Sequence, residues 1–146
     1  SAVAELNVIS VRAGVFEQSS SVKPNRLLAR SYVERIRPTK RVVASLGTKF
    51  GIRYQVSGKT PENNRVTLLY LTPGVIDEEG VRHDKYMEIK DLRASAGSHT
   101  MAFEMVEPYE LVPGNWQMMV FERDRLLVKE TFEVIIKGTE VLSEFN

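Results

Sequence analysis

The sequence predicts an all-β protein, an antiparallel β-sandwich of about seven to nine strands with at most one short helix. Two patterns indicate this: runs of about six to twelve residues lie between regularly spaced turn signals, and apolar and polar side chains alternate within the runs. The chain has 146 residues, of which 42% are hydrophobic, and no cysteine. Because a chain of this length can bury a core without disulfides or metals, we expect one domain over residues 1–146, with its core at about 6–137 and a C-terminal tail at 138–146.

The clearest strand is residues 49–57, where every even position is apolar or aromatic and every odd position is small or polar. A period of two is typical of a strand with one face in the core and the other in water. We expect Gly47 to form a turn before this strand, and Gly51 to mark a flat or bulged position over which a neighbouring side chain lies. Similar patterns predict further strands at 6–16, 98–107, 116–122 and 126–136, and the nearly unbroken apolar run 65–72 predicts a strand in the middle of a sheet.

Four positions inside these strands carry specific expectations. Trp116 lies in the core-facing register, so we expect it in the core rather than on a ligand-binding platform. On the opposite side of the same strand Met119 and Phe121 are also apolar, which predicts a strand covered on both faces. Glu130 interrupts the apolar face of its strand, and a strand end or a β-bulge would accommodate it.

Residues 25–37 fit two patterns. Leu28, Tyr32 and Ile36 recur every four residues, as on the apolar face of an amphipathic helix. With a period of two, Tyr32, Glu34 and Ile36 share one face, as in a strand. The pattern by itself favours neither structure.

The composition argues against several classes of partner. The chain has 20 Lys and Arg against 19 Asp and Glu, and a formal charge of +1 gives no overall field to recruit nucleic acid or an anionic membrane. Tyr32 is the aromatic residue interleaved with its most basic segment, too little for stacking on bases. The longest apolar runs fall short of the roughly 18 residues of a membrane span. We therefore expect no nucleic acid and no membrane span.

The residues that could carry chemistry form no catalytic or metal-binding motif. His83 and His99 have no spacing that brings two imidazoles to one metal, so each is expected to be a hydrogen-bonded histidine at the surface or at a strand end. Ser98 precedes His99 on a strand and must point to the opposite face. The acidic run 77–80 lacks the alternating ligands of a calcium loop and is expected to be a solvated hairpin tip. We predict no enzymatic activity and no catalytic, cofactor-binding or metal-binding residues.

Charge is distributed unevenly along the chain. Residues 1–65 hold 12 basic and 4 acidic residues, a balance of +8, and residues 66–146 hold 8 and 15, a balance of −7. The interpretation we favour is that strands from the two halves lie side by side and their exposed charges alternate across one sheet. The alternative is a polarised surface that binds an acidic partner or a second copy of the chain. Its basic side would be the basic stretch: Arg30, Arg35, Arg37, Lys40 and Arg41. Acids that could face this stretch are Glu104, Glu107, Glu110 and Glu122.

Two strings of the sequence resemble a known family. Residues 46–54, LGTKFGIRY, are similar to its G-T-x-F-G-[IF]-R-[FY] strand, and residues 110–117, ELVPGNWQ, to its V-P-G-x-W hairpin, which closes with an F-x-V strand as at 126–134. The family is a small bacterial domain of unknown function, number 3859 in its series, and the likeness spans roughly residues 8–136. The resemblance implies an immunoglobulin-like sandwich and favours strand over helix at 25–37. It implies no catalytic residue, since the signature positions are glycines, prolines and core aromatics.

Two functions fit these features. The first is a non-enzymatic module that contacts a protein partner or a second copy of the chain through the basic stretch. The second is a ligand-binding or hydrolytic sandwich with a cleft lined by Met118, Met119 or Tyr109 and nearby carboxylates. The start of the chain fits either the end of a cleaved signal sequence or a cloning remnant, and we lean towards the cell envelope.

Overall fold

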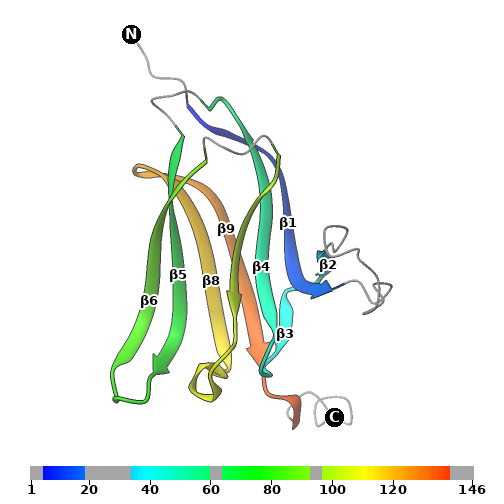
Figure 1. Ribbon diagram of the computed structural model, residues 1–146, viewed down its shortest axis with the longest axis vertical. Helices are drawn as coiled ribbons and strands as arrows, with labels where there is room; N and C mark the ends of the chain where they lie inside the picture. Colours follow the sequence, from blue (N-terminus) through cyan, green and yellow to red (C-terminus); the bar gives the residue numbers. More distant parts are fainter. Residues whose placement is uncertain (1–4, 19–33, 60–63, 93–96, 139–146) are drawn as a thin grey trace, which may run out of the picture.

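The computed structural model describes residues 5–18, 34–59, 64–92 and 97–138, and these residues form two β-sheets packed face to face (Figure 1). The four-stranded sheet has the order β2-β1-β4-β7, with β1 at Asn7–Gln18, β2 at Glu34–Pro38, β4 at Lys49–Ser57 and β7 at His99–Glu104. The five-stranded sheet has the order β3-β9-β8-β5-β6, with β3 at Arg41–Val43, β5 at Arg65–Ile76, β6 at Arg82–Asp91, β8 at Gly114–Glu122 and β9 at Arg125–Ile135. A short 3₁₀ turn, η2, at Pro108–Glu110 lies between β7 and β8. The predicted all-β sandwich and its number of strands are confirmed.

The chain passes from one sheet to the other between β2 and β3. β2 pairs with β1 in the four-stranded sheet, whereas β3 pairs with β9 in the five-stranded sheet. Only Thr39 and Lys40 separate the two strands, so β3 forms without a hairpin reversal and lies parallel to β9. This pair departs from the predicted antiparallel pattern, which the other described strand pairs follow.

The core between the sheets is centred on three aromatic rings. Phe50 of β4 meets Trp116 of β8 and Phe132 of β9 edge to face, with ring centroids 5.7 Å and 5.3 Å apart. All three side chains are buried, and such tilted pairs add to the energy of apolar burial. The prediction of Trp116 in the core is confirmed. Its indole Nε1 donates a hydrogen bond to the Val112 carbonyl at 3.0 Å.

Most of the predicted strands are found with small shifts at their ends. The strand at 65–72 continues to Ile76, past a register shift between Leu71 and Val75. The strand predicted at 98–107 ends at Glu104, because the Met105 N–H turns to the Thr48 carbonyl at 2.8 Å. The alternation did not predict β3, or β6, whose charged residues lie on both of its faces.

Residues 25–37, which fit both helix and strand, are only partly described. The described part begins at Glu34, and Glu34–Pro38 forms β2. The strand interpretation holds for this part, and residues 25–33 lie outside the described residues.

The two glycines around the start of β4 have different roles. Gly47 has φ +91° and forms the expected turn. At Gly51 a Cβ atom would lie 2.1 Å from the Met101 carbonyl oxygen and 2.6 Å from the Ala102 Cα. The expected close approach is present, and it is made by the backbone of β7 together with the Ala102 side chain, whose Cβ would lie 3.0 Å away.

Glu130 lies within β9, opposite Met118, and not at a strand end. The register shift between β8 and β9 falls at Val120 and Phe121, so the expected bulge is also elsewhere. Instead the Lys40 ammonium pairs with the Glu130 carboxylate, whose side chain is 21% exposed. This ion pair stabilises the carboxylate inside a regular strand, and the expectation of a strand end or bulge was wrong.

Candidate functional site

The basic stretch lies along β2, β3 and the link between them, and three of its cations pair with carboxylates. Arg37 Nε lies 2.8 Å from Glu17 Oε2, and Arg41 Nε lies 3.4 Å from Glu133 Oε1. Lys40 pairs with Glu130. Arg35 is exposed on β2, and Arg30 lies outside the described residues.

These pairs agree with the interpretation of alternating charges. The pairs of Lys40 and Arg41 join the basic first half of the chain to β9 in the acidic second half. Two of the four acids expected to face the stretch are engaged elsewhere: Glu110 accepts the Val106 and Glu107 N–H groups at 2.8 Å each, and Glu122 pairs with Arg125. Sequence proximity did not identify the partners, because β9 meets β3 only in the folded sheet.

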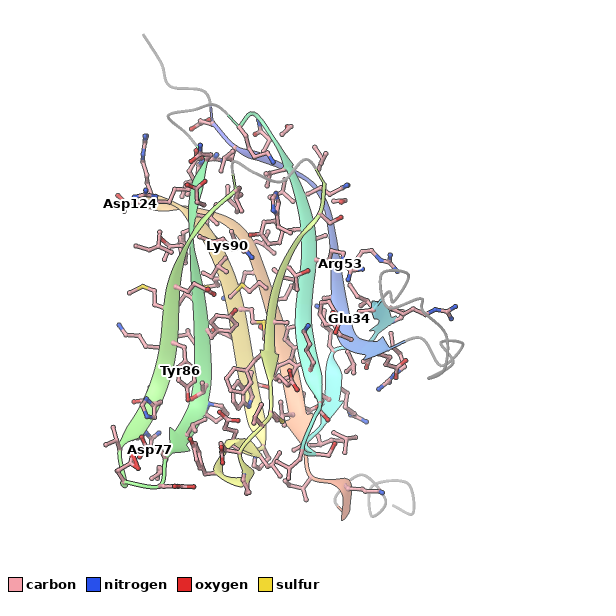
Figure 2. The ribbon with its side chains drawn as sticks, viewed as in Figure 1. Glu34, Arg53, Asp77, Tyr86, Lys90 and Asp124 are labelled. Atoms are coloured by element: carbon pink, nitrogen blue, oxygen red, sulfur yellow. The ribbon has the colours of Figure 1, made fainter. Side chains whose placement is uncertain are left out.

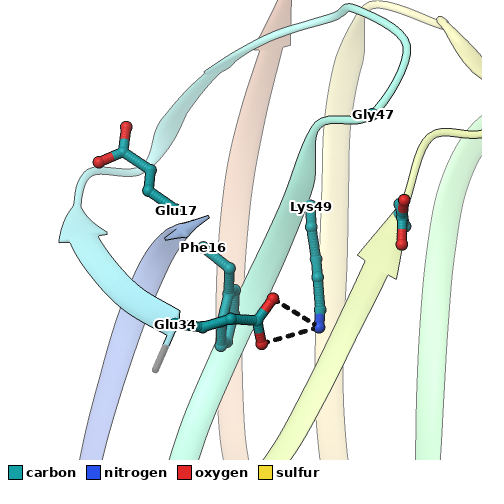
Figure 3. A pocket seen from close by; sticks show the side chains of 6 residues that line it. Phe16, Glu17, Glu34, Gly47 and Lys49 are labelled. Carbon is teal, nitrogen blue, oxygen red and sulfur yellow. Dashed lines mark hydrogen bonds and ion pairs between the residues drawn. The ribbon is translucent and has the colours of Figure 1, made fainter. Parts of the chain in front are cut away.

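A polar hollow of about 460 Å³ opens beside the ends of β1, β2 and β4 (Figure 3). The Lys49 ammonium lies at its centre and contacts both carboxylate oxygens of Glu34, at 3.0 and 3.1 Å. Phe16, Glu17, Gly47 and Glu104 complete the lining.

Phe16 forms the apolar side of this hollow. Its ring lies under two cations, Lys49 Nζ at 5.3 Å and Arg53 Cζ at 5.4 Å from the ring centroid. The side chain is 6% exposed although it shares a face with Lys49, its partner across β1 and β4, rather than with the core. Cation–π contacts of this kind stabilise a ring on an otherwise charged surface.

The cleft residues expected from the sequence do not lie together. Met118 is buried in the core, whereas Met119 points to the other face of the same strand. Tyr109 lies in η2 and packs against the core cluster. A carboxylate-lined hollow is present, but none of these three residues lines it.

The outward side of the five-stranded sheet carries apolar side chains in two rows. One row crosses the sheet from Met87 on β6 through Leu69 on β5 to Met119 on β8, and ends at Lys129 on β9. The other runs from Ile89 through Thr67 to Phe121 and Leu126. We call the six apolar side chains the outer apolar face: Leu69, Met87, Ile89, Met119, Phe121 and Leu126.

No described strand lies over the outer apolar face (Figure 1). Ile89 is 67% exposed, Met87 63% and Leu126 46%, while Met119 and Phe121 are half-buried by their neighbours in the sheet. Among the described residues, therefore, the prediction that β8 is covered on both faces is not met. The alternation had identified Met119 and Phe121 as a second apolar face, but it could not tell a covered face from an open one.

The acidic run 77–80 forms the tip of the β5–β6 hairpin, as predicted (Figure 2). Asp77 Oδ1 accepts the N–H groups of Glu79 at 3.0 Å and Val81 at 2.9 Å, and Asp77 Oδ2 lies 2.8 Å from His83 Nε2. The hydrogen bond from His83, followed by those from the backbone, lowers the pKa of the Asp77 carboxyl. His83 is also stacked on Tyr86 at 5.5 Å, so this carboxylate and imidazole hold the turn together.

His99 begins β7 and is buried, at 4% exposure. Its ring lies 5.5 Å from that of Tyr54, and its Nε2 has no hydrogen-bond partner among the described residues. Burial lowers the pKa of His99, because the charged imidazolium loses its water. The prediction that His99 lies at a strand end is confirmed. The prediction that its side chain is hydrogen-bonded is wrong for Nε2 among the described residues. Ser98 is exposed, on the opposite side, as predicted.

The two packed sheets, with the chain switching sheets between β2 and β3, define an immunoglobulin-like β-sandwich. The structure is similar to the crystal structure of an immunoglobulin-like protein from Pseudomonas aeruginosa, with a TM-score of 0.78 and 43% sequence identity over 92% of this chain and 100% of the other. The chain belongs to the family described as "Domain of unknown function (DUF3859)", whose model matches residues 4–134. No curated protein matches the chain. The family resemblance and the implied fold are confirmed.

Two features are absent among the described residues. No helix among them is long and apolar enough to cross a membrane. Within the same residues, no group of three His, Asp or Glu side chains is arranged to hold a metal ion.

Proposed function

We propose that this immunoglobulin-like sandwich is a non-enzymatic module that acts by contact with a protein partner, and that the outer apolar face is the surface it uses. The observation that carries the proposal is the pair of apolar rows across the open side of the five-stranded sheet. Contiguous apolar area on a soluble protein is typical of an interaction site, whereas scattered apolar residues are not.

The energetics favour contact at this face. Burying an exposed Leu, Met or Phe side chain contributes about 1.5–3 kcal/mol, so several such side chains together suffice for a stable complex before the costs of association are counted. Lys85 and Lys129 flank the row of Met87, Leu69 and Met119. The matching partner would present an apolar strip bordered by acidic residues.

The basic stretch is a weaker candidate for the same task. A partner's carboxylates would compete with Glu17, Glu130 and Glu133, which already pair with three of its cations. Exposed ion pairs contribute little net energy. We expect Arg35→Glu with Arg37→Glu to change partner binding less than a charge placed on the outer apolar face does, and binding measured for both variants compares the two surfaces.

A site-specific photo-cross-linker tests the proposal. The reactive amino acid is placed at Met119 on the outer apolar face and, as the control, at Gln55 on the outward side of the four-stranded sheet, and both variants are expressed in the native host. We expect the Met119 position to give a discrete cross-linked protein, and a Leu69→Lys change in the same chain to remove it. Equal products from both positions, or none from Met119, would refute the proposal.

The hollow at Lys49 favours a second candidate, the binding of a small ligand. Three carboxylates line the hollow beside the single Lys49 ammonium, and an excess of negative charge attracts a small organic cation. Lys49 already neutralises Glu34 and Arg37 pairs with Glu17, which leaves Glu104 as the carboxylate for a ligand. NMR titration with a panel of small amines tests this candidate: shifts confined to the hollow, and lost in Glu104→Gln, would support it, and no shifts would rule it out.

A further inference from the structure

β6 is the last strand of the five-stranded sheet, and its outer edge is open. In the order β3-β9-β8-β5-β6 it pairs with β5 and with no other described strand. In Figure 1 it forms the left side of the sheet over most of its length, and the β8–β9 turn reaches past its upper end. A strand of 10 residues with an open edge is a template for pairing with another strand.

Half of the main-chain groups of β6 point at this edge. Across the β5–β6 ladder, the Leu92 N–H donates to the Asn64 carbonyl at 2.7 Å. Hydrogen-bonded pairs alternate along an antiparallel ladder, and the register is uninterrupted over this part of β6. Every second residue counted back from Leu92 therefore bonds to β5. The residues between them, Lys85, Met87 and Ile89, direct their N–H and carbonyl groups at the open edge.

The side chains of β6 protect this edge only in part. Natural edge strands are shielded by proline, by bulges or by charged side chains. β6 carries such charges, with Lys85 on its outward side and Asp84, Glu88 and Lys90 on the other, but it also exposes Met87 at 63% and Ile89 at 67% beside its open edge. A strand that pairs here gains main-chain hydrogen bonds and buries apolar area in the same step.

We propose that the strand that pairs here is β6 of a second copy of the chain, antiparallel to the first and related to it by a two-fold axis through Met87. The inference deepens the proposed function and rests on it, because it gives a contact module one named partner. The argument comes from the charge pattern of β6.

A two-fold axis perpendicular to the sheet places the outward faces of the two copies on the same side. In an antiparallel pair, residues directly opposite each other point to the same face. The axis must therefore pass through one residue of β6 and not between two residues. With Met87 at the centre, each Asp84 lies opposite a Lys90 of the other copy, and Met87 lies opposite itself. No like charges meet between residues 84 and 90, and two pairs of opposite charge form.

Centring on Ile89 brings no like charges together but pairs only residues 87–91 of β6. Every register other than that of Met87 that pairs seven or more residues of β6 brings like charges together. Centring on Tyr86 places Asp84 opposite Glu88, and centring on Glu88 or on Lys85 places that residue opposite its own copy. Like charges directly opposite on neighbouring strands are destabilising. The sequence of β6 thus selects one register for pairing with itself.

The pairing has a consequence for the proposed binding surface. The two five-stranded sheets would join into one continuous sheet, with both outer apolar faces on the same side. Met87 and Ile89, which lie at the margin of one copy, would lie at the centre of the joined surface. A partner would then meet a doubled apolar area.

Light scattering coupled to size-exclusion chromatography, run from micromolar to millimolar concentration, tests the dimer. Asp84→Lys places two lysines opposite each other at both symmetric positions, and we expect it to weaken the dimer about tenfold. Lys90→Asp should weaken it equally. The double change Asp84→Lys with Lys90→Asp restores opposite charges and should restore the dimer. The control is Asp124→Lys in the β8–β9 turn, which makes the same chemical change outside β6.

The outcomes separate this inference from the proposed function. A chain that is monomeric at every concentration overturns the dimer, as does a double change that fails to restore it or a control that weakens it equally. If the Met119 cross-link to another protein persists in the monomeric Asp84→Lys variant, the contact function stands without the dimer. If the dimer persists while Met119 gives no cross-link to another protein, the proposed heterologous partner fails and the dimer stands.

Discussion

Among the ion pairs of the described residues, the one at the turn between β8 and β9 has the most buried carboxylate. It tests how much burial of an ion pair contributes to the free energy of unfolding. The Glu122 carboxylate accepts the Leu6 N–H at 3.3 Å from each oxygen and pairs with the Arg125 guanidinium. Arg125 also donates to the Leu6 carbonyl. Leu6 is fully buried, so this network fixes the start of β1 to the end of the β8–β9 hairpin.

The two partners differ in burial, and the cost of removing each should differ accordingly. The Glu122 side chain is 6% exposed and that of Arg125 is 40% exposed. Arg125→Met removes the guanidinium from a carboxylate that is almost fully buried, at a cost of about 3–5 kcal/mol. Glu122→Gln keeps an oxygen for the Leu6 N–H and frees a guanidinium that can turn to water, at a cost of about 1–2 kcal/mol. We therefore expect the arginine change to destabilise the fold more.

The combined variant gives the decisive result. Adding Glu122→Gln to Arg125→Met removes the stranded charge, so the double variant should be more stable than Arg125→Met alone. Urea denaturation at neutral pH measures all three free energies of unfolding, and each kcal/mol corresponds to about 2–4 °C in Tm for a chain of this size.

An exposed pair serves as the control for this series. The side chains of Arg41 and Glu133 are 60% and 57% exposed, and breaking their ion pair should cost less than about 1 kcal/mol. Costs that simply add in the double variant, or an Arg125→Met cost no larger than that of Arg41→Met, would refute the reasoning from burial.

Four further predictions concern individual side chains. Gly51→Ala should destabilise the fold by about 1–3 kcal/mol, because its Cβ would collide with the β7 backbone. The control is Gly97→Ala, whose Cβ would have no atom within 4 Å and which should change stability by under about 0.5 kcal/mol. Equal effects of the two changes in urea denaturation would contradict this. Tyr54→Phe removes a buried hydroxyl that has no partner among the described residues and should be neutral or stabilising by about 1 kcal/mol. Burial raises the pKa of Tyr54 and of Tyr70 to about 12. The free energy of unfolding should therefore fall as the pH rises above 10.0, because tyrosines ionise there in the unfolded chain. An ultraviolet titration in which both tyrosines of the folded protein ionise near pH 10.0 would refute this. Because the pKa of Asp77 is lowered, its carboxylate stabilises the fold at pH values above the ordinary pKa of 3.8, and this contribution is lost as the pH falls below 3.8. In Asp77→Asn the stability should therefore depend less on pH below 3.8 in an acid-unfolding measurement.

The strands that were predicted well are those with one face in the core. β4 was found at residues 49–57 because each even side chain, from Phe50 to Val56, is buried between the sheets. β6 escaped prediction because only Tyr86 packs against the core, and the charges on both faces remove the alternation. Periodicity thus reports burial rather than the strand itself.

The candidate site was predicted only in part, for a related reason. Met119 and Phe121 stood out in the sequence as apolar residues facing away from the core. Whether another layer covers them depends on elements distant in the sequence, which alternation within one strand does not contain. The same holds for Lys40 and Arg41, whose carboxylate partners lie about 90 residues further along the chain.

The amino-acid sequence by itself determined the fold class and the composition of the core, because the alternation of side chains and the turn residues act over a few residues. Tertiary structure decided which charges pair, that β3 runs parallel to β9, and which apolar face is left open, since each depends on strands that meet from far apart in the chain. A sheet has two faces and two edges, and the sequences of its strands specify which side chains lie on each face and along each edge. Only the assembled layers decide which face and which edge remain for a partner.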